Sequence, residues 1–206
     1  MDPSTRQRRP HGDRTRDQIL DSAITLVAAG GLTAATQRKV AQHAGVSLAS
    51  VTYHFRTATD LLDASLSRAT SLHIARLEGL RDRALSGELS LVEAHRAAAR
   101  DSDGAVADSA VVAYELLVGA IRNEHLRPRV DELIAALSSF FEPWIPRPQF
   151  STGVAAACFS LTLFDLARGG SPETAAQIET VFDLFGLSKV VEDHVNPDRQ
   201  GSDPQL

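Results

Sequence analysis

Apolar residues recur at intervals of three and four along most of this chain, and no segment shows the strict alternation of a strand. The clearest stripe lies in residues 14–29, where six apolar side chains share one helical face. Gly30 and Gly31 follow it, and glycine commonly ends a helix. We therefore expect an all-α fold. The stripe consists of Ile19, Leu20, Ala23, Ile24, Leu26 and Val27.

Start and stop signals divide the rest of the chain into further helices. Thr36, Ser47 and Ser90 stand where helix caps are expected, and Pro128 suits a first helical turn. The order predicts a flexible basic arm over residues 1–13, a three-helix head over 14–57, a helical domain over 58–188 and a disordered tail over 189–206. The helices expected after the first are 37–43, 47–55, 60–85, 90–99, 106–123, 127–141, 150–168 and 171–186.

Residues 36–55 have the spacing of two short helices joined by a tight turn. Gly45 supplies the backbone freedom of the turn, and Val46 fills the space between the two helices. Ser47 then begins the second helix, so that Leu48, Ala49 and Ser50 project from its first turn. In a helix-turn-helix these positions enter the major groove, so the pattern indicates a DNA reader.

The charge of the chain is unevenly distributed. The 206 residues carry a net charge of −5, which taken alone argues mildly against a nucleic-acid partner. Residues 1–56, however, hold eight Arg or Lys against four Asp, whereas residues 57–206 hold thirteen basic against twenty-two acidic residues. Only the N-terminal quarter is suited to phosphates.

Several other classes of protein find no support in the sequence. The single cysteine, Cys158, allows neither an internal disulfide nor a cysteine zinc site. No segment approaches the roughly 20 apolar residues that span a bilayer, and the polar start is unlike a signal peptide, so we expect a cytoplasmic protein. Nucleophile-elbow, phosphate-loop and zinc-protease motifs are missing, and His95 near Glu88 and Glu93 is too loosely spaced for a metal. We expect no enzyme activity, no cofactor and no metal.

The N-terminal residues together resemble a TetR-family transcriptional regulator. The family's proteins are all-helical homodimers with a three-helix DNA-binding head and a variable C-terminal domain that binds a small molecule. One position departs from the pattern, because Ala58 stands where the family usually has a phosphate-contacting lysine. The motifs that carry the resemblance are RTRDQILDSAITLVAAGG, Thr36, Val40-Ala41, Ala44-Gly45-Val46-Ser47, Tyr53-His54-Phe55 and Asp60-Leu61-Leu62.

The resemblance implies a set of DNA contacts in the head. Thr36, Tyr53 and His54 would lie at phosphates, although Thr36 is equally a helix cap and His54 could pack in the core. Of the base-facing residues, Leu48 and Ala49 can touch only thymine methyl groups, whereas serine and threonine are permissive hydrogen-bonders. Arginines of the arm could follow the DNA backbone, or stay solvated. The residues expected to contact DNA are Thr36, Gln37, Arg38, Lys39, Ser47, Leu48, Ala49, Ser50, Thr52, Tyr53 and His54.

The helical domain would supply the ligand site and the dimer. Small residues on 150–168 allow a close helix approach, and with the last helix they could form a four-helix interface or pack only within one chain. An apolar set further forward could line a pocket or simply form core. The expected ligand contacts are Leu72, Tyr114, Leu117, Val118, Ile121, Phe140, Phe141 and Trp144. The expected dimer contacts are Gly153, Ala156, Ala157, Ser160, Phe164, Ile178, Val181 and Phe182.

The expected function is that of a ligand-responsive repressor, a homodimer that binds a two-fold site on double-stranded DNA and is released by a small hydrophobic effector. The alternative is a helical protein-interaction module of the same fold without DNA binding, which Ala58 and the acidic domain keep open. The sequence specifies neither the operator, the regulated genes nor the effector. It also does not specify whether DNA binding represses or activates transcription.

Overall fold

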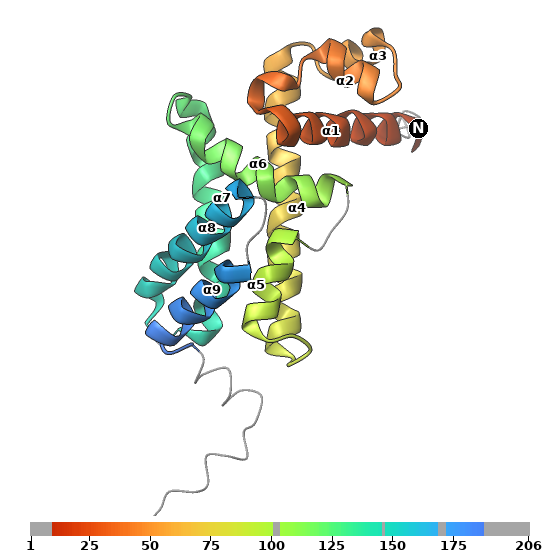
Figure 1. Ribbon diagram of the computed structural model, residues 1–206. Coiled ribbons are helices and arrows are strands. Elements are labelled where there is room, and N and C mark those ends of the chain that lie inside the picture. Colours follow the sequence, from red (N-terminus) through yellow and green to blue (C-terminus); the bar gives the residue numbers. More distant parts are fainter. Residues whose placement is uncertain (1–9, 101–103, 146, 169–171, 188–206) are drawn as a thin grey trace, which may run out of the picture. The chain divides into compact units, whose positions relative to one another are not determined.

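The computed structural model describes residues 10–100, 104–145, 147–168 and 172–187, and every regular element in these ranges is a helix (Figure 1). This confirms the all-α fold. The α-helices are α1 Pro10–Gly30, α2 Gln37–His43, α3 Leu48–His54, α4 Ala58–Leu85, α5 Leu91–Arg100, α6 Gly104–Ala120, α7 Arg127–Phe141, α8 Ser151–Ala167 and α9 Pro172–Leu184. Short 3-10 turns are η1 Leu32–Ala34, η2 Glu124–Leu126, η3 Glu142–Trp144 and η4 Pro148–Phe150.

The expected helices are all present, but some ends differ. Helix α1 begins at Pro10 rather than at residue 14, because proline fits the first helical turn, where its missing N–H has no intrahelical partner. The expected arm is therefore shorter by the residues from Pro10 to Asp13. Residues 1–9, with Arg6, Arg8 and Arg9, and the tail from 188 onward lie outside the described residues. None of the described helices is long and apolar enough to cross a membrane.

Contacts divide the described residues into two compact units, and the division differs from the expected head and body. The first unit contains the residues through Leu72 together with α6, and the second contains the described residues of 73–100 and those from His125 onward. Helix α4 thus contributes its first half to one unit and its second half to the other. The expected boundary after residue 57 missed this division, because α6 packs along α1 within the first unit (Figure 1).

The core of the first unit is built on the apolar stripe of α1. Five of its six members are buried, and only Leu26 is partly exposed. Val40 of α2 and Val51 of α3 are fully buried in the same unit, so each short helix is anchored by its inward face. Gly31 follows α1 with a φ of 77°, where a side chain would be strained, and its N–H donates to the Val27 carbonyl at 2.7 Å.

The core of the second unit contains four aromatic side chains, Phe140, Phe141, Trp144 and Phe182. Phe140 and Phe141 pack edge to face at a ring distance of 4.9 Å, and Phe182 lies 6.0 Å from Phe141. Trp144 and Cys158 are buried in the same cluster. Burial raises the pKa of the Cys158 thiol to about 12, so this cysteine is an inert packing residue.

Candidate nucleic-acid interface and ligand groove

Helices α2 and α3 form the expected helix-turn-helix, and both begin at the predicted caps. The Thr36 hydroxyl accepts from the Lys39 N–H at 3.3 Å, and the Ser47 hydroxyl accepts from the Ser50 N–H at 3.0 Å. Between the helices, Gly45 has a φ of 65°, and the Val46 N–H donates to the Ala41 carbonyl at 3.0 Å. These bonds close a tight turn that fixes the start of α3.

The outer face of α3 is exposed. Leu48 is 47% exposed, and Ala49 and Thr52 are also exposed, whereas Val51 on the opposite face is fully buried. Ser50 is half-buried. The structure therefore brings three of the four predicted base-facing residues to one open surface.

Two of the predicted DNA contacts have hydrogen bonds that the sequence did not reveal. The Thr52 hydroxyl donates back to the carbonyls of Leu48 and Ala49, at 3.2 and 3.1 Å, so its proton is used inside the helix. The Gln37 side-chain nitrogen donates to the Phe55 carbonyl at 2.8 Å, which joins the start of α2 to the end of α3. Gln37 therefore has a positioning role that its place in the sequence gave no means of predicting.

The side chains predicted to reach phosphates differ in exposure. Tyr53 is 83% exposed, and its ring meets His54 edge to face at 5.2 Å. His54 is half-buried beside the Phe55 ring, at 6.3 Å, so it combines packing with partial access to solvent. Arg38 and Lys39 are exposed on the first turn of α2.

A basic residue that was not among the predicted DNA contacts, Arg56, lies just before the start of α4. Thr57 and Asp60 cap this helix reciprocally, with N–O distances of 3.0 and 2.9 Å. Ala58, at the position of the family's usual lysine, is exposed. Arg56 is exposed two residues earlier, and its place between α3 and α4 was the signal that could have identified it.

The predicted ligand contacts fall on both units. In the first unit Tyr114 is buried, Leu72 and Leu117 are half-buried, and Val118 and Ile121 are exposed, Ile121 by 76%. In the second unit Phe140, Phe141 and Trp144 belong to the core cluster described above. Within that unit they contribute core packing, which is the alternative that the sequence left open.

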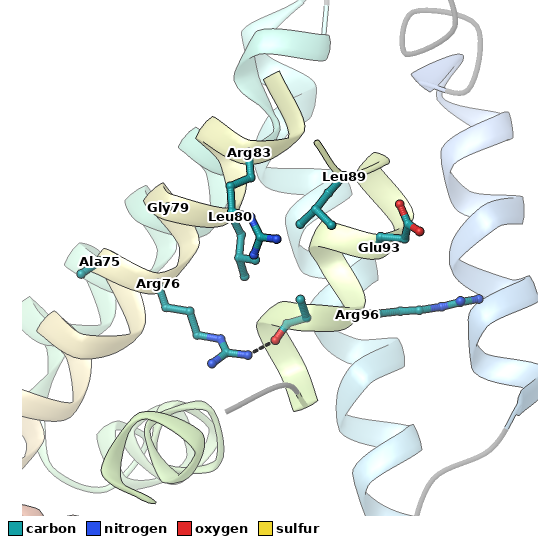
Figure 2. A pocket seen from close by; sticks show the side chains of 9 residues that line it. Ala75, Arg76, Gly79, Leu80, Arg83, Leu89, Glu93 and Arg96 are labelled. Carbon is teal, nitrogen blue, oxygen red and sulfur yellow. Dashed lines mark hydrogen bonds between the residues drawn. The ribbon is translucent and has the colours of Figure 1, made fainter. Parts of the chain in front are cut away.

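The second unit has an open groove of about 570 Å³ between the second half of α4 and α5 (Figure 2). Its walls combine apolar side chains with three arginines and one glutamate, and none of the predicted ligand contacts lies among them. On a sequence pattern these polar residues look like ordinary solvated helix positions, so the groove was missed. The lining residues are Ala75, Arg76, Gly79, Leu80, Arg83, Leu89, Glu93, Arg96 and Ala97.

The charged groups of the groove already have protein partners. Arg76 donates to the Ala97 carbonyl across the groove, as the dashed line in Figure 2 marks. Arg83 pairs with Glu88 at 2.6 Å. The Glu93 carboxylate accepts from both the N–H and the hydroxyl of Ser90 at 2.8 Å, and these bonds, the backbone one foremost, lower its pKa. A ligand entering the groove would have to compete with these interactions.

The predicted dimer contacts separate into an exposed and a buried group. Gly153, Ala156, Ser160 and Phe164 are exposed on α8, and Phe164 is 59% exposed. Ala157 and Val181 are half-buried. Ile178 and Phe182 are only 3% and 2% exposed in a single chain, because α9 turns them into the core of its own unit. The expectation that these two form interface surface is therefore corrected, and Leu184 and Phe185 are the exposed apolar residues at the end of α9.

A buried polar pair lies in the core of the second unit. His95 Nε2 is 3.1 Å from the Thr162 hydroxyl, which itself donates to the Cys158 carbonyl at 3.0 Å. Since the hydroxyl has one proton, Nε2 of His95 must be the donor in this pair. Burial lowers the pKa of His95 to about 4, so the ring is neutral at pH 7. Among the side chains that the structure describes, no three potential ligands gather to hold a metal.

The chain is similar to a known sequence family and to several solved structures. Residues 19–65 match the family described as bacterial regulatory proteins, tetR family. This segment covers the second half of α1, the helix-turn-helix and the start of α4. No curated protein matches the chain.

Solved structures match over most of the chain. A member of the TetR family from Streptomyces coelicolor A3 is 25% identical, with 83% of this chain and 98% of that chain covered and a TM-score of 0.65. The multidrug binding protein EbrR complexed with imidazole is 25% identical, with coverages of 82% and 94% and a TM-score of 0.63. The same protein complexed with ethidium is 26% identical, with coverages of 81% and 97% and a TM-score of 0.60.

Proposed function

Because the chain belongs to the TetR family of transcriptional regulators, we propose that it is a repressor that binds a two-fold DNA site as a homodimer and is released by a small hydrophobic effector. The observation that carries the proposal is the exposed outer face of α3, fixed by the Ser47 cap and anchored by buried Val51. A surface of this kind fits a major groove.

The charge of the head supports binding to DNA. The excess of basic over acidic residues is confined to residues 1–56, and Arg38, Lys39 and Arg56 are exposed within the helix-turn-helix and just after it. Exposed cations at the flanks of a reading helix bind phosphates and hold the helix in register. The acidic remainder of the chain would be repelled by DNA, so binding is directed to the head.

The exposed apolar residues of α8 and of the end of α9 support a homodimer. Phe164 and Leu163 on α8 are exposed, together with Leu184 and Phe185, and a second copy of the chain would bury them. One head binds DNA weakly, whereas two heads separated by roughly 34 Å read consecutive major-groove faces. Dimerisation therefore accounts for the affinity that a regulator needs.

The proposed effector is a small hydrophobic molecule. EbrR, a similar protein, is a multidrug binding protein whose solved complexes contain imidazole or ethidium. The candidate places for such a molecule are the groove beside α5 and the predicted contacts of the first unit that are exposed or half-buried, which are Leu72, Leu117, Val118 and Ile121. Its binding would shift the population of the chain away from the form that fits the operator.

Selection of bound sites from random duplex DNA tests the proposal. The full-length protein should enrich an inverted repeat, and a variant with Arg38→Ala and Lys39→Ala should enrich it far less at the same salt concentration. If folded, dimeric protein enriches no site even at low salt, the DNA-binding proposal fails. The interaction module without DNA binding, which Ala58 and the acidic body favour, then takes its place.

A further inference from the structure

We propose that the exposed face of α3 reads the methyl groups of thymine rather than hydrogen-bonding groups on base edges. Each half-site would then carry thymines where Leu48, Ala49 and Thr52 meet the major groove. This inference rests on the proposed function, and it specifies the chemistry of the sequence that the head selects.

The three side chains form one exposed apolar surface. Leu48 and Thr52 are one helical turn apart, and Ala49 lies three residues before Thr52, so all three share a face. All three are exposed, whereas Val51 behind them is fully buried and fixes the orientation of the helix. Leucine and alanine offer no hydrogen bond to a base, and in the major groove their apolar partner is the C5-methyl group of thymine.

The structure indicates that Thr52 offers DNA an apolar methyl group and not a hydrogen-bond donor. Its hydroxyl has a single proton, which is shared between the carbonyls of Leu48 and Ala49 at 3.2 and 3.1 Å. No donor remains for an acceptor on a base. What Thr52 can offer is its methyl group and the lone pairs of its oxygen, and the methyl group adds to the surface formed by Leu48 and Ala49.

The neighbouring amide donor is also engaged. The side-chain nitrogen of Gln37 donates to the Phe55 carbonyl at 2.8 Å, so this residue holds α2 and α3 together. Charged donors are available on α2, where Arg38 and Lys39 are exposed, and such donors favour phosphates and guanine. Polar readout would therefore come from α2, and apolar readout from α3.

Uracil provides a direct test, because it pairs like thymine and keeps its O4 acceptor but lacks the methyl group. Once selection has given an operator, each thymine of a half-site is replaced singly by uracil, and the affinity of the dimer is measured. Removal of one buried methyl group should weaken binding by about fourfold. Uracil at thymines outside the half-sites is the control and should leave the affinity unchanged.

A matched pair of variants assigns the methyl contact to Thr52. Thr52→Ser keeps the hydroxyl and removes the methyl group, whereas Thr52→Val keeps a methyl group and removes the hydroxyl. We expect Thr52→Ser to lose the sensitivity to uracil at one base pair and Thr52→Val to retain it. Leu48→Ala should lose the sensitivity at a neighbouring position.

The failure of this inference can be told from the failure of the proposed function. Absence of any enriched site would end both. An enriched operator that binds equally well with thymine and uracil at every position would overturn the methyl readout alone, and so would a Thr52→Val protein that loses sequence preference while Thr52→Ser keeps it.

Discussion

The Thr25 hydroxyl of α1 donates a hydrogen bond to the Asp108 carboxylate of α6, with an oxygen–oxygen distance of 2.6 Å. This bond joins the first helix of the DNA-binding head to a helix that lies more than eighty residues later in the chain. Helix α6 packs along α1 in the same unit, and Arg68 of α4 reaches Asp21 of α1 at 2.6 Å. The head is thus held by two helices, α4 and α6, and the expected head over residues 14–57 included neither of them.

Loss of the bond between Thr25 and Asp108 should destabilise the protein. Thr25→Val keeps the shape of the side chain but leaves the carboxylate without this donor, and a hydrogen bond to a charged group contributes about 1.5–3 kcal/mol. We expect a decrease of that order in the free energy of unfolding, measured by urea denaturation. Thr59→Val is the matched control, since Thr59 is exposed on α4. Equal stabilities of the two variants would show that the bond contributes nothing.

Stability should fall as the pH is lowered from about 6.5 to 4. Burial, with a smaller effect of Arg76 on His73, lowers the pKa values of His73 and His95 to about 4. The unfolded chain takes up these protons near the ordinary pKa of 6.5 and the folded chain only near 4, so the unfolded state binds more protons in this window. Each histidine should contribute a slope of about 1.4 kcal/mol per pH unit.

A substitution of His95 separates the two contributions. His95→Gln keeps a donor for the Thr162 hydroxyl but cannot titrate, so the slope of unfolding free energy against pH between 4 and 6.5 should fall by about half. His43→Gln is the control, because His43 is exposed on α2. An unchanged slope in His95→Gln would mean that this ring is not held neutral by burial.

DNA binding should respond in opposite directions to changes at Arg56 and Ala58. Both residues are exposed at the junction of α3 and α4. Arg56→Ala should weaken operator binding and reduce the salt dependence by about one phosphate contact, whereas Ala58→Lys should strengthen binding and increase the salt dependence. The measurement is operator affinity over a range of salt concentrations, with exposed Arg122→Ala as the control. A salt dependence that Arg56→Ala leaves unchanged would remove Arg56 from the interface.

The local part of the fold could be predicted from the sequence because its signals are local. A cap such as Thr36 or Ser47 bonds to a backbone N–H three residues away, so the start of each short helix is determined within a few residues. The turn at Gly45 is also determined locally, because it requires the positive φ that glycine adopts easily. The sequence therefore predicted both ends of α2, and each end of α3 to within one residue.

The features that the sequence did not predict depend either on contacts between residues far apart in the chain or on a choice between two possible hydrogen-bond partners. Apolar spacing shows which face of a helix is apolar, but not what covers that face, so Ile178 and Phe182 were assigned to an interface although their own unit buries them. The bond between Gln37 and Phe55 and the one from Thr25 to Asp108 join residues whose proximity only the fold creates. For Thr52, the choice between base and backbone was invisible in the sequence.

Phe164 of α8 is exposed and Phe182 of α9 is buried, so substitutions of these two residues distinguish the proposed dimer surface from the core of one chain. Phe164 is exposed on α8, so Phe164→Asp should convert the proposed dimer into folded monomers by placing a charge in the interface. Sedimentation equilibrium gives the molecular mass, and Ile134→Asp on α7 is the control for an exposed apolar residue elsewhere. A Phe164→Asp protein that remains dimeric would move the interface away from this face.

Phe182→Ala should behave differently. Because this ring is packed against Phe141 and His95 inside one chain, its removal creates a cavity and should lower the free energy of unfolding by about 3–5 kcal/mol. The molecular mass is measured by sedimentation equilibrium at a protein concentration well above the dissociation constant of the dimer. Under these conditions the folded molecules of Phe182→Ala should have the same mass as the wild-type dimer. Dissociation of Phe182→Ala without loss of stability would instead place the ring at the subunit interface, because only an intermolecular contact can be lost without leaving a cavity in the folded chain.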